Sequence, residues 1–376
     1  MKLNSLNFTI FNDSITVYWK KQKAIKEEFY YLIYLNNKVV DKIYKTHYTF
    51  NNLKAQVKYS VKVEIYIKNT LVKTYLAEVT TKENPKVIDV TKSPYNAVGD
   101  GVKLNTSAIQ SAINDCKKGE RVYIPKGVFL TGALNLHSDM ELYVEKDAVI
   151  QGTTNCADYL PKVNSRFEGH EMTCYRSLIN IGSMTREKVY NCKNVVIRGG
   201  GTICGGGYEL ATNIIETERE LLKEYMQSLG DKINEYDNLD SLPGRARGRL
   251  LCVANTNNAI FSDITFKNGP AWTTQYIYSK NIITQNCYIY SRPVHNGDGW
   301  NPDSSENCVV FGTGFETGDN SIAIKSGKNP EGNIINRPTK NVFIFDCKIN
   351  SGGGFAIGSE MSGGVENVFV WDVDTT

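Results

Sequence analysis

The chain has 376 residues, of which 41% are hydrophobic and 22% are charged, and its formal net charge is +3. This balance is typical of a folded protein with a sizeable core and excludes a disordered chain. So small a charge gives no indication of a nucleic acid or a membrane surface as partner, although it would not strongly repel an acidic substrate. No stretch of the sequence approaches the roughly 18 apolar residues of a membrane-spanning helix.

The opening residues 1–9 alternate between polar and apolar types and lack the apolar core of a signal peptide. The cytoplasm is therefore the default expectation, and the compartment is otherwise left open. The nine cysteines are scattered along the chain without the spacing of a zinc site. We expect them to be reduced and buried, and we expect no metal and no other cofactor.

Residues 1–84 contain short alternating runs at the spacing of a small β-sandwich. Asn36-Asn37 predicts a hairpin turn between two of these strands. Leu53 followed by Tyr59 is similar to the corner in which a tyrosine hydroxyl ties a loop to the edge of a sandwich. With Trp19 as the core aromatic residue, the segment resembles a fibronectin type III domain, which would serve as a spacer or docking module. The expected strands are 15–19, 30–34, 59–65 and 77–81.

After a linker at residues 83–86, one phrase recurs, in which an asparagine is followed by alternating apolar residues. From Asn258 onward its copies are 23 to 34 residues apart, a period that is typical of a solenoid of stacked strands. Cys287 and Cys347 each lie six residues after their asparagine, so we expect both to stack inside the solenoid. The asparagines that begin the phrase are Asn194, Asn258, Asn281, Asn307, Asn341 and Asn367.

Two segments interrupt the repeat. Residues 105–117 have apolar residues at helical spacing, with Asn105 or Thr106 as the cap, and a helix there would cover the open edge of the first coil. Residues 208–229 predict an amphipathic helical insertion, which would either wall a cleft or lie on the surface. The sequence stops at Thr376 inside a repeat, without the capping coil that a solenoid needs, so we expect a fragment or a truncated product.

Two glycine-rich loops, 296–304 and 317–327, carry the acids Asp303 and Asp319. Acids in turns at the ends of adjacent strands would place carboxyl groups side by side, as glycoside hydrolysis requires. One protonated acid would assist the leaving oxygen, and one carboxylate would activate water or attack the sugar. Repulsion between the two would raise one pKa into the useful range. The alternative is that these acids only hold their loops through backbone hydrogen bonds.

Six segments carry distinctive motifs in a fixed order along the chain. They are 90–101, 108–113, 122–132, 301–303 (Asn-Pro-Asp), 318–327 with Gly-Asp and Ala-Ile-Lys-Ser-Gly, and 357–364. Together they resemble the polygalacturonase family, glycoside hydrolase family 28, over about residues 87–376. The resemblance implies a right-handed parallel β-helix, so we expect an all-β chain with a small β-sandwich before an incomplete helix. It also implies the inverting hydrolysis of α-linked galacturonan in pectin without a metal.

Carried over position by position, the resemblance makes Asp319 the general acid and Asp303 the base that activates water. Three departures put activity in question. Asn320 stands where the family has a second acid, and the loss of one base would cost roughly 10²–10⁴-fold in rate. Gly353 stands where the family has a histidine, one coil along from Asp319 and facing the same cleft. The family's Arg-Ile-Lys motif, which grips the substrate carboxylate, would lie beyond Thr376.

Basic, polar and aromatic residues in and near the two loops are candidates for sugar contacts. Arginines can pair bidentately with galacturonate carboxylates, and aromatic faces can stack on sugar rings. For each of these residues the alternative to a substrate contact is a packing or solvent-exposed role. For His295 the alternative is a position in the core or in a turn. The residues that we assign to substrate binding are Lys325, Asn301, Asn320, His295, Arg292 and Arg249. Further candidates are Arg245, Arg247, Trp272, Gln275, Tyr276 and Trp300.

Three functions stay open on this basis. The first is a polygalacturonase-like hydrolase of pectic polysaccharide, whose motifs favour exo action. The second is the same fold acting on rhamnogalacturonan or another pectic backbone, and the third is a non-catalytic carbohydrate-binding relative. A polysaccharide lyase on this fold would usually need calcium ligands and a basic proton abstractor, and the acidic pair without a metal cluster argues against it. The expected partner is a pectic polysaccharide.

Overall fold

The computed structural model describes residues 5–21, 28–236 and 238–375. The chain divides into two compact units, one formed by 1–86 with 370–373 and the other by 87–369 with 374–376. Nearly all regular elements are β-strands, and the described residues contain no helix that is long and apolar enough to cross a membrane.

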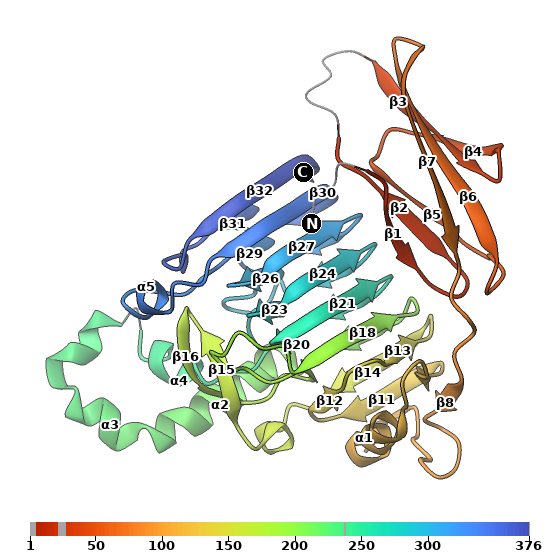
Figure 1. Cartoon of the computed structure of the whole chain (residues 1–376). Helices are drawn as coiled ribbons and strands as arrows, with labels where there is room; N and C mark the ends of the chain where they lie inside the picture. Colours follow the sequence, from red (N-terminus) through yellow and green to blue (C-terminus); the bar gives the residue numbers. More distant parts are fainter. Residues whose placement is uncertain (1–4, 22–27, 237, 376) are drawn as a thin grey trace. The chain divides into compact units, whose positions relative to one another are not determined.

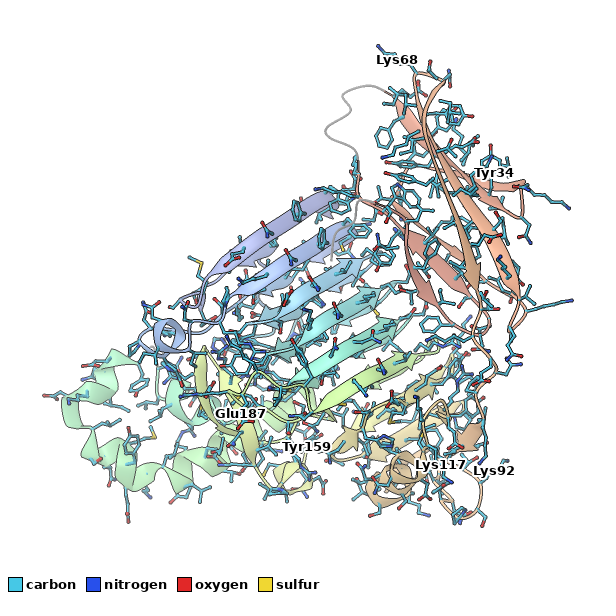
Figure 2. The ribbon with its side chains drawn as sticks, in the orientation of Figure 1. Tyr34, Lys68, Lys92, Lys117, Tyr159 and Glu187 are labelled. Atoms are coloured by element: carbon cyan, nitrogen blue, oxygen red, sulfur yellow. The ribbon has the colours of Figure 1, made fainter. Side chains whose placement is uncertain are left out.

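The first unit is a small β-sandwich of two antiparallel sheets, with strand orders β1-β2-β5 and β4-β3-β6-β7. Trp19 lies in its core with its ring centroid 5.1 Å from that of Tyr31. At its surface Tyr34, labelled in Figure 2, donates a hydrogen bond to Glu64 at 2.6 Å. The strands are β1 (Asn7–Ile10), β2 (Ile15–Tyr18), β3 (Phe29–Leu35), β4 (Lys38–Ile43), β5 (His47–Phe50), β6 (Lys58–Ile67) and β7 (Thr70–Thr80).

Two local predictions for this unit are confirmed. Asn36 and Asn37 both have positive φ, at 49° and 64°, as a two-residue hairpin turn between β3 and β4 requires. The hydroxyl of Tyr59 accepts a hydrogen bond from the backbone N–H of Lys54 at 2.9 Å. The tyrosine therefore fastens the loop that precedes its own strand.

The second unit is a parallel β-helix, as the repeat and the resemblance predict (Figure 1). Its strands form three columns, and each strand pairs in parallel with the equivalent strand of the next coil. Two columns are joined through the 13-residue β30 (Thr339–Ser351), which pairs with strands of both.

The first column consists of β8 (Val87–Asp89), β10 (Arg121–Ile124), β13 (Glu141–Val144), β18 (Cys192–Arg198), β21 (Thr256–Ser262), β24 (Lys280–Gln285) and β27 (Glu306–Phe311). The second consists of β9 (Asp100–Leu104), β11 (Gly127–Thr131), β14 (Ala148–Gly152), β19 (Thr202–Cys204), β22 (Thr265–Lys267), β25 (Tyr288–Tyr290) and β28 (Gly314–Glu316). The third consists of β12 (Leu134–Leu136), β17 (Ile179–Ile181), β20 (Leu251–Ala254), β23 (Thr274–Ile277), β26 (Trp300–Asp303), β29 (Ile322–Ile324) and β31 (Phe355–Ile357).

The recurring asparagines form a ladder along the turn that enters the first column. Asn307 donates to Asn281 at 2.9 Å, Asn341 donates to Asn307 at 3.1 Å, and Asn367 at the start of β32 (Val365–Thr375) donates to Asn341 at 3.1 Å. Each of the six has a φ between 56° and 69°, a left-handed conformation that asparagine tolerates better than most residues. The repeat therefore encodes both the turn and the bonds that hold successive turns in register.

Cys287 and Cys347 are buried inside the β-helix, as their spacing predicts. Each donates to a backbone carbonyl of the preceding coil, Cys287 to Phe261 at 3.6 Å and Cys347 to Val310 at 3.8 Å. Burial raises the pKa of the Cys287 thiol to about 12, so it stays protonated and packs as a small apolar group. All nine cysteines are free, and six of them are buried.

The two predicted helical segments form, and one is longer and more broken than expected. α1 (Thr106–Asp115) packs Ile109, Ala112 and Ile113 against the first coils, beside β12. The insertion forms α2 (Gly207–Leu221), α3 (Lys223–Ser228), the 3₁₀ helix η2 (Gly230–Glu235) and α4 (Ser241–Gly244). Only its first half buries an apolar stripe, because Leu221 and Tyr225 are exposed.

Three further elements lie outside the columns. They are the 3₁₀ helix η1 (Cys156–Tyr159), an antiparallel hairpin of β15 (Val163–Phe167) and β16 (His170–Cys174), and α5 (Glu331–Ile335). The hairpin had no signal in the sequence, and it becomes important for the site below.

We predict that Asn307→Ala lowers the free energy of unfolding of the β-helix by about 2–3 kcal/mol, because alanine keeps the left-handed backbone at a cost and loses two ladder bonds. Asn336→Ala is the matched control, since Asn336 also has positive φ but no side-chain hydrogen bond within the described residues. Denaturant unfolding of both variants measures the difference. Equal losses would contradict a stabilising ladder.

Candidate active site

A cleft of about 560 Å³ is lined by loops before and after the third-column strands, by the helical insertion and by the β15–β16 hairpin. Acidic side chains outnumber basic ones in its lining. The acids are Glu168, Glu235, Asp298, Asp319 and Glu360, and the bases are Arg245, Lys325 and Lys328. Polar and aromatic residues complete it, namely Tyr236, Ser241, Trp272, Asn296, Asn320 and Ser359.

Strand register sets which residues share this cleft. Trp300 pairs with Ile322, and Ile322 pairs with Phe355 in the next coil. The residues two places earlier in each coil are Asp298, Asn320 and Gly353, so register places them in one row. Backbone bonds between these loops keep the row aligned, because Gly299 N–H donates to Asn320 O and Ser321 N–H donates to Gly354 O, each at 2.9 Å.

Asp298 is the most strongly perturbed acid of the cleft. Its side chain is only 3% exposed, and Lys325 lies 3.3 Å from one carboxylate oxygen. Burial raises its pKa to about 7, and the nearby charges of Asp319 and Glu360 add to the shift, while Lys325 opposes it. Asp298 therefore changes its protonation state near neutral pH, which is the property expected of an acid–base group.

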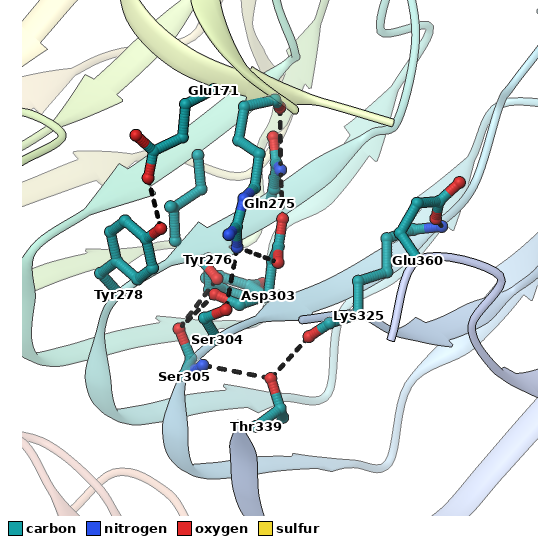
Figure 3. Close-up of polar contacts among 12 residues, drawn as sticks. Glu171, Gln275, Tyr276, Tyr278, Asp303, Ser304, Ser305, Lys325, Thr339 and Glu360 are labelled. Carbon is teal, nitrogen blue, oxygen red and sulfur yellow. Dashed lines mark hydrogen bonds and ion pairs between the residues drawn. The ribbon is translucent and has the colours of Figure 1, made fainter. Parts of the chain in front are cut away.

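Lys325 connects two acids of the cleft. Its ammonium lies 2.7 Å from Glu360 and 4.3 Å from the centre of the Trp272 ring. Burial disfavours its charge, but Asp298 and Glu360 outweigh this and raise the pKa of Lys325. Burial likewise disfavours the ionised form of Glu360, and the bonds to Lys325 hold the Glu360 pKa below its ordinary value. Figure 3 shows the Lys325 side chain extending toward Glu360.

Asp319 and Asn320 both line the cleft in the turn before β29. Asp319 is half-buried, and its carboxylate accepts the backbone N–H of Asn320 at 2.9 Å. Gly353 in the next coil donates its N–H to the carbonyl of Asp319 at 2.8 Å, and a Cβ built there would lie 2.8 Å from the Asn320 side-chain oxygen. A side chain at position 353 would thus reach the same cleft, in line with the sequence argument for the missing histidine.

Asp303, which the resemblance makes the water-activating base, is not part of the cleft lining. Its side chain is completely buried, and one oxygen pairs with Arg166 at 2.7 Å. The other oxygen accepts from Gln275 at 3.0 Å, and Figure 3 shows Asp303 between Gln275 and Ser304. With both oxygens bound inside the protein, Asp303 has no access to water or to a sugar. Asp298, from the same loop, lies in the cleft instead.

The residues assigned to substrate binding fall into three groups. Lys325 and Asn320 line the cleft. Arg249 and Asn301 are buried beneath it, where Arg249 bonds to Gln275 and Asn301 bonds to the carbonyl of Thr274. His295 and Arg292 are exposed and lie outside the described lining.

The further aromatic and basic candidates divide in the same way. Trp272 and Arg245 line the cleft, and Arg245 pairs with Glu168 at 2.9 Å. Trp300 and Tyr276 face the interior of the β-helix, where each bonds to Thr284, so they have the packing role that the sequence left as the alternative. Arg247 is also buried and bonds to Asn296.

Four important residues were missed from the sequence. Asp298 lies in the glycine-rich loop 296–304, but no local pattern separated it from Asp303. Glu360 lies in the motif segment 357–364, but it was not among the predicted site residues. Arg166 and Glu168 lie on the hairpin, far from every motif, and had no signal. Among the described residues, no group of three His, Cys, Asp or Glu side chains is arranged to hold a metal ion.

We predict that Asp298→Asn stabilises the β-helix unit above pH 7. A folded-state pKa raised to about 7 means that stability is full below the ordinary pKa of an aspartate, declines as the pH rises from there, and levels off above about pH 7, where Asp298 is ionised in both states. The neutral amide removes that cost, so its melting temperature should exceed the parent's by a few degrees at pH 8 and by much less at pH 5. The exposed Asp147→Asn is the control. A pH-independent difference would contradict the raised pKa.

Comparison with known proteins agrees with this fold. Residues 114–375 match the family described as Glycosyl hydrolases family 28. An exo-poly-α-D-galacturonosidase of Dickeya chrysanthemi is 30% identical over 94% of this chain and 59% of its own length. A probable polygalacturonase of Vitis vinifera is 30% identical over 74% of this chain and 53% of its own length. The chain thus spans less than two thirds of the length of these relatives.

Solved structures show the same fold. The Yersinia enterocolitica family 28 exopolygalacturonase superposes with a TM-score of 0.84 at 21% identity, over 99% of this chain and 74% of that one. The exopolygalacturonase of Thermotoga maritima gives 0.64 at 27% identity, over 77% of this chain and 66% of that one. With its motifs, its parallel β-helix and a family match over most of its length, the chain belongs to glycosyl hydrolases family 28.

Proposed function

We propose that this chain hydrolyses α-glycosidic bonds of pectic polysaccharide in the manner of a polygalacturonase, by inversion and from chain ends. The observation that carries the proposal is the pair Asp298 and Asp319 in one cleft, close enough for the charge of Asp319 to raise the pKa of Asp298. The names of the relatives support the substrate, and the Dickeya chrysanthemi protein supports exo action.

In this proposal Asp319 donates a proton to the leaving oxygen, and Asp298 accepts a proton from the attacking water. Asp298 replaces Asp303, which is held by Arg166 and Gln275. A buried carboxylate with a raised pKa is a stronger base than an exposed one, so Asp298 can act without the second acid that Asn320 replaces. Lys325 balances the charge of Asp298, and Glu360 fixes the position of Lys325 through its own ion pair.

The cleft also offers a partner for an acidic sugar. Lys325 and Arg245 are already paired with acids of the protein. Lys328 is exposed at the cleft and has no ion-pair partner within the described parts of the chain. We assign the contact with a galacturonate carboxylate to Lys328, with Arg245 as a second group that a substrate could draw away from Glu168.

A binding-only function is the second candidate, and a specific observation favours it. Asn320 and Gly353 both adjoin Asp319, so the two departures from the family pattern fall at the reacting acid itself. Such a chain would bind pectic oligosaccharides and turn none over. Action on rhamnogalacturonan instead of polygalacturonate is the remaining alternative within hydrolysis.

For residues 1–84 we propose a fibronectin type III-like spacer or docking module, followed by the hydrolase unit at 87–376. The three-plus-four strand order and the Tyr59 corner support the resemblance.

We predict that the full chain releases reducing ends from polygalacturonate and much more slowly from rhamnogalacturonan. Asp319→Asn and Asp298→Asn should each lower kcat by roughly 10²–10⁴-fold, because each removes one of the two proton-transfer groups. Glu78→Gln, an exposed acid of the sandwich, is the control and should match the parent. Turnover that survives both substitutions would contradict the assignment. Oligosaccharide binding without turnover by the parent would favour the binding-only candidate.

We predict that kcat/KM rises with pH toward about 7, because Asp298 must be ionised to accept a proton and its pKa is raised to about 7. Initial rates on polygalacturonate between pH 4 and pH 8 measure this limb, and Asp298→Asn should abolish it. A rate that falls through the same range would reverse the two roles and make Asp298 the proton donor.

A further inference from the structure

A fully buried ion pair fastens the β15–β16 hairpin to the outer face of the third column. Arg166 of β15 donates to Asp303 of β26 at 2.7 Å and to the hydroxyl of Ser304 at 2.8 Å. The side chains of Arg166 and Asp303 are both 0% exposed. Burial opposes the charge of Arg166, yet Asp303 raises the Arg166 pKa above its ordinary value, so Arg166 keeps its charge.

Two further side chains close a circuit around this pair. Gln275 donates to the second oxygen of Asp303 at 3.0 Å and accepts from Arg249 at 2.9 Å. Arg249 in turn donates to the backbone carbonyl of Arg166 at 2.8 Å. The hairpin is therefore held at Arg166, both by its side chain and by its backbone carbonyl. The groups that hold it come from β23, from β26 and from Arg249, which precedes β20.

Such a circuit contributes little net free energy of folding for the charges that it buries. Burying an ion pair costs more desolvation free energy than well-packed apolar residues of similar size would, but removing one partner leaves an uncompensated charge in the interior. The bonds are also directional, because Arg166 Nη1 donates to Asp303 and Ser304, while Gln275 and Arg249 donate to Asp303 and to the carbonyl of Arg166. The circuit thus fixes the position of the hairpin more than it adds to the core.

The next residues along the hairpin reach the cleft. Phe167 stacks on Trp272 at 5.5 Å between centroids, and Trp272 lines the cleft under Lys325. Glu168 lines the cleft and holds Arg245 at 2.9 Å. Gly169 accepts the backbone N–H of Lys328 at 3.1 Å. A displacement of Arg166 would therefore move the groups that meet the sugar and leave Asp298 and Asp319 in their own loops.

We propose that Arg166 and Asp303 are positioning residues that form a latch, and that this latch seats the hairpin as the cleft wall and sets the affinity for substrate. Asp303 acts as the buried counter-ion of the latch and takes no part in proton transfer. The seating of the hairpin stands independently of the catalytic activity, whereas the effect on affinity rests on the function proposed above.

The experiment compares the full-length parent with Arg166→Met, Asp303→Asn and the double variant that carries both. Hydrogen exchange of the hairpin, residues 163–174, reports its seating, and rates on polygalacturonate report kcat, KM and their pH dependence. Ser304→Ala is a milder variant that removes one bond of Arg166 and keeps both charges. Glu366→Gln is the control, because its pair with Lys340 lies in an exposed setting on the same unit.

Both single variants should speed exchange in the hairpin and raise KM by roughly ten- to a hundredfold, with the pH profile of kcat unchanged in shape. The double variant should be no worse than the more severe single one, because the two residues act through one contact. Ser304→Ala should also speed exchange in the hairpin and raise KM, by smaller amounts. This variant therefore still tests the latch if a charge variant does not fold.

Two results would overturn the latch. One is unchanged hairpin exchange in Asp303→Asn and Arg166→Met. The other is a loss of kcat and of one pH limb in Asp303→Asn that Arg166→Met does not reproduce, which would restore Asp303 as a proton-transfer group. If the parent cuts neither polymer, the proposed function fails, and the exchange measurement still decides the latch.

Discussion

Parallel pairing in register is the constraint on which the rest of the β-helix depends. Each coil must present the same position at the same point of its circuit, because a strand of three or four residues cannot bury a face alone. The asparagine ladder fixes one turn of the coils from Asn194 to Asn367, with Asn257 as the acceptor for Asn281. Once that register is set, strand pairing alone places Asp298, Asn320 and Gly353 in one row.

The same constraint explains how two acids of one loop acquire opposite environments. Asp298 lies in the turn before β26 and pairs with Lys325 in the cleft. Asp303 ends β26 on its outward face, where the hairpin seals it against Arg166. Burial without a full set of partners raises the pKa of Asp298, whereas Asp303 has a partner for each oxygen.

The sequence was sufficient for the parts of the molecule that repeat. The Asn phrase predicted the coils, Asn36-Asn37 predicted a turn, and the two glycine-rich loops predicted where carboxylates gather. It was insufficient where residues distant in sequence decide the outcome. Asp303 and Arg166 are 137 positions apart, and nothing local to the loop indicates that a hairpin will cover it. The alternation of β26 indicates that Trp300 faces inward and Asp303 faces outward. It does not indicate whether an outward acid is exposed to solvent or covered by another segment.

A crystal structure of the Asp319→Asn variant soaked with a short galacturonate oligosaccharide tests the central claim most directly. The account predicts a sugar in the cleft lined by Trp272 and Lys325, with Asp298 in contact with a water or a sugar hydroxyl near the scissile bond. It also predicts that Asp303 stays paired with Arg166 and Gln275. An oligosaccharide bound elsewhere on the β-helix, or an Asp303 released from Arg166 to touch the sugar, would contradict it.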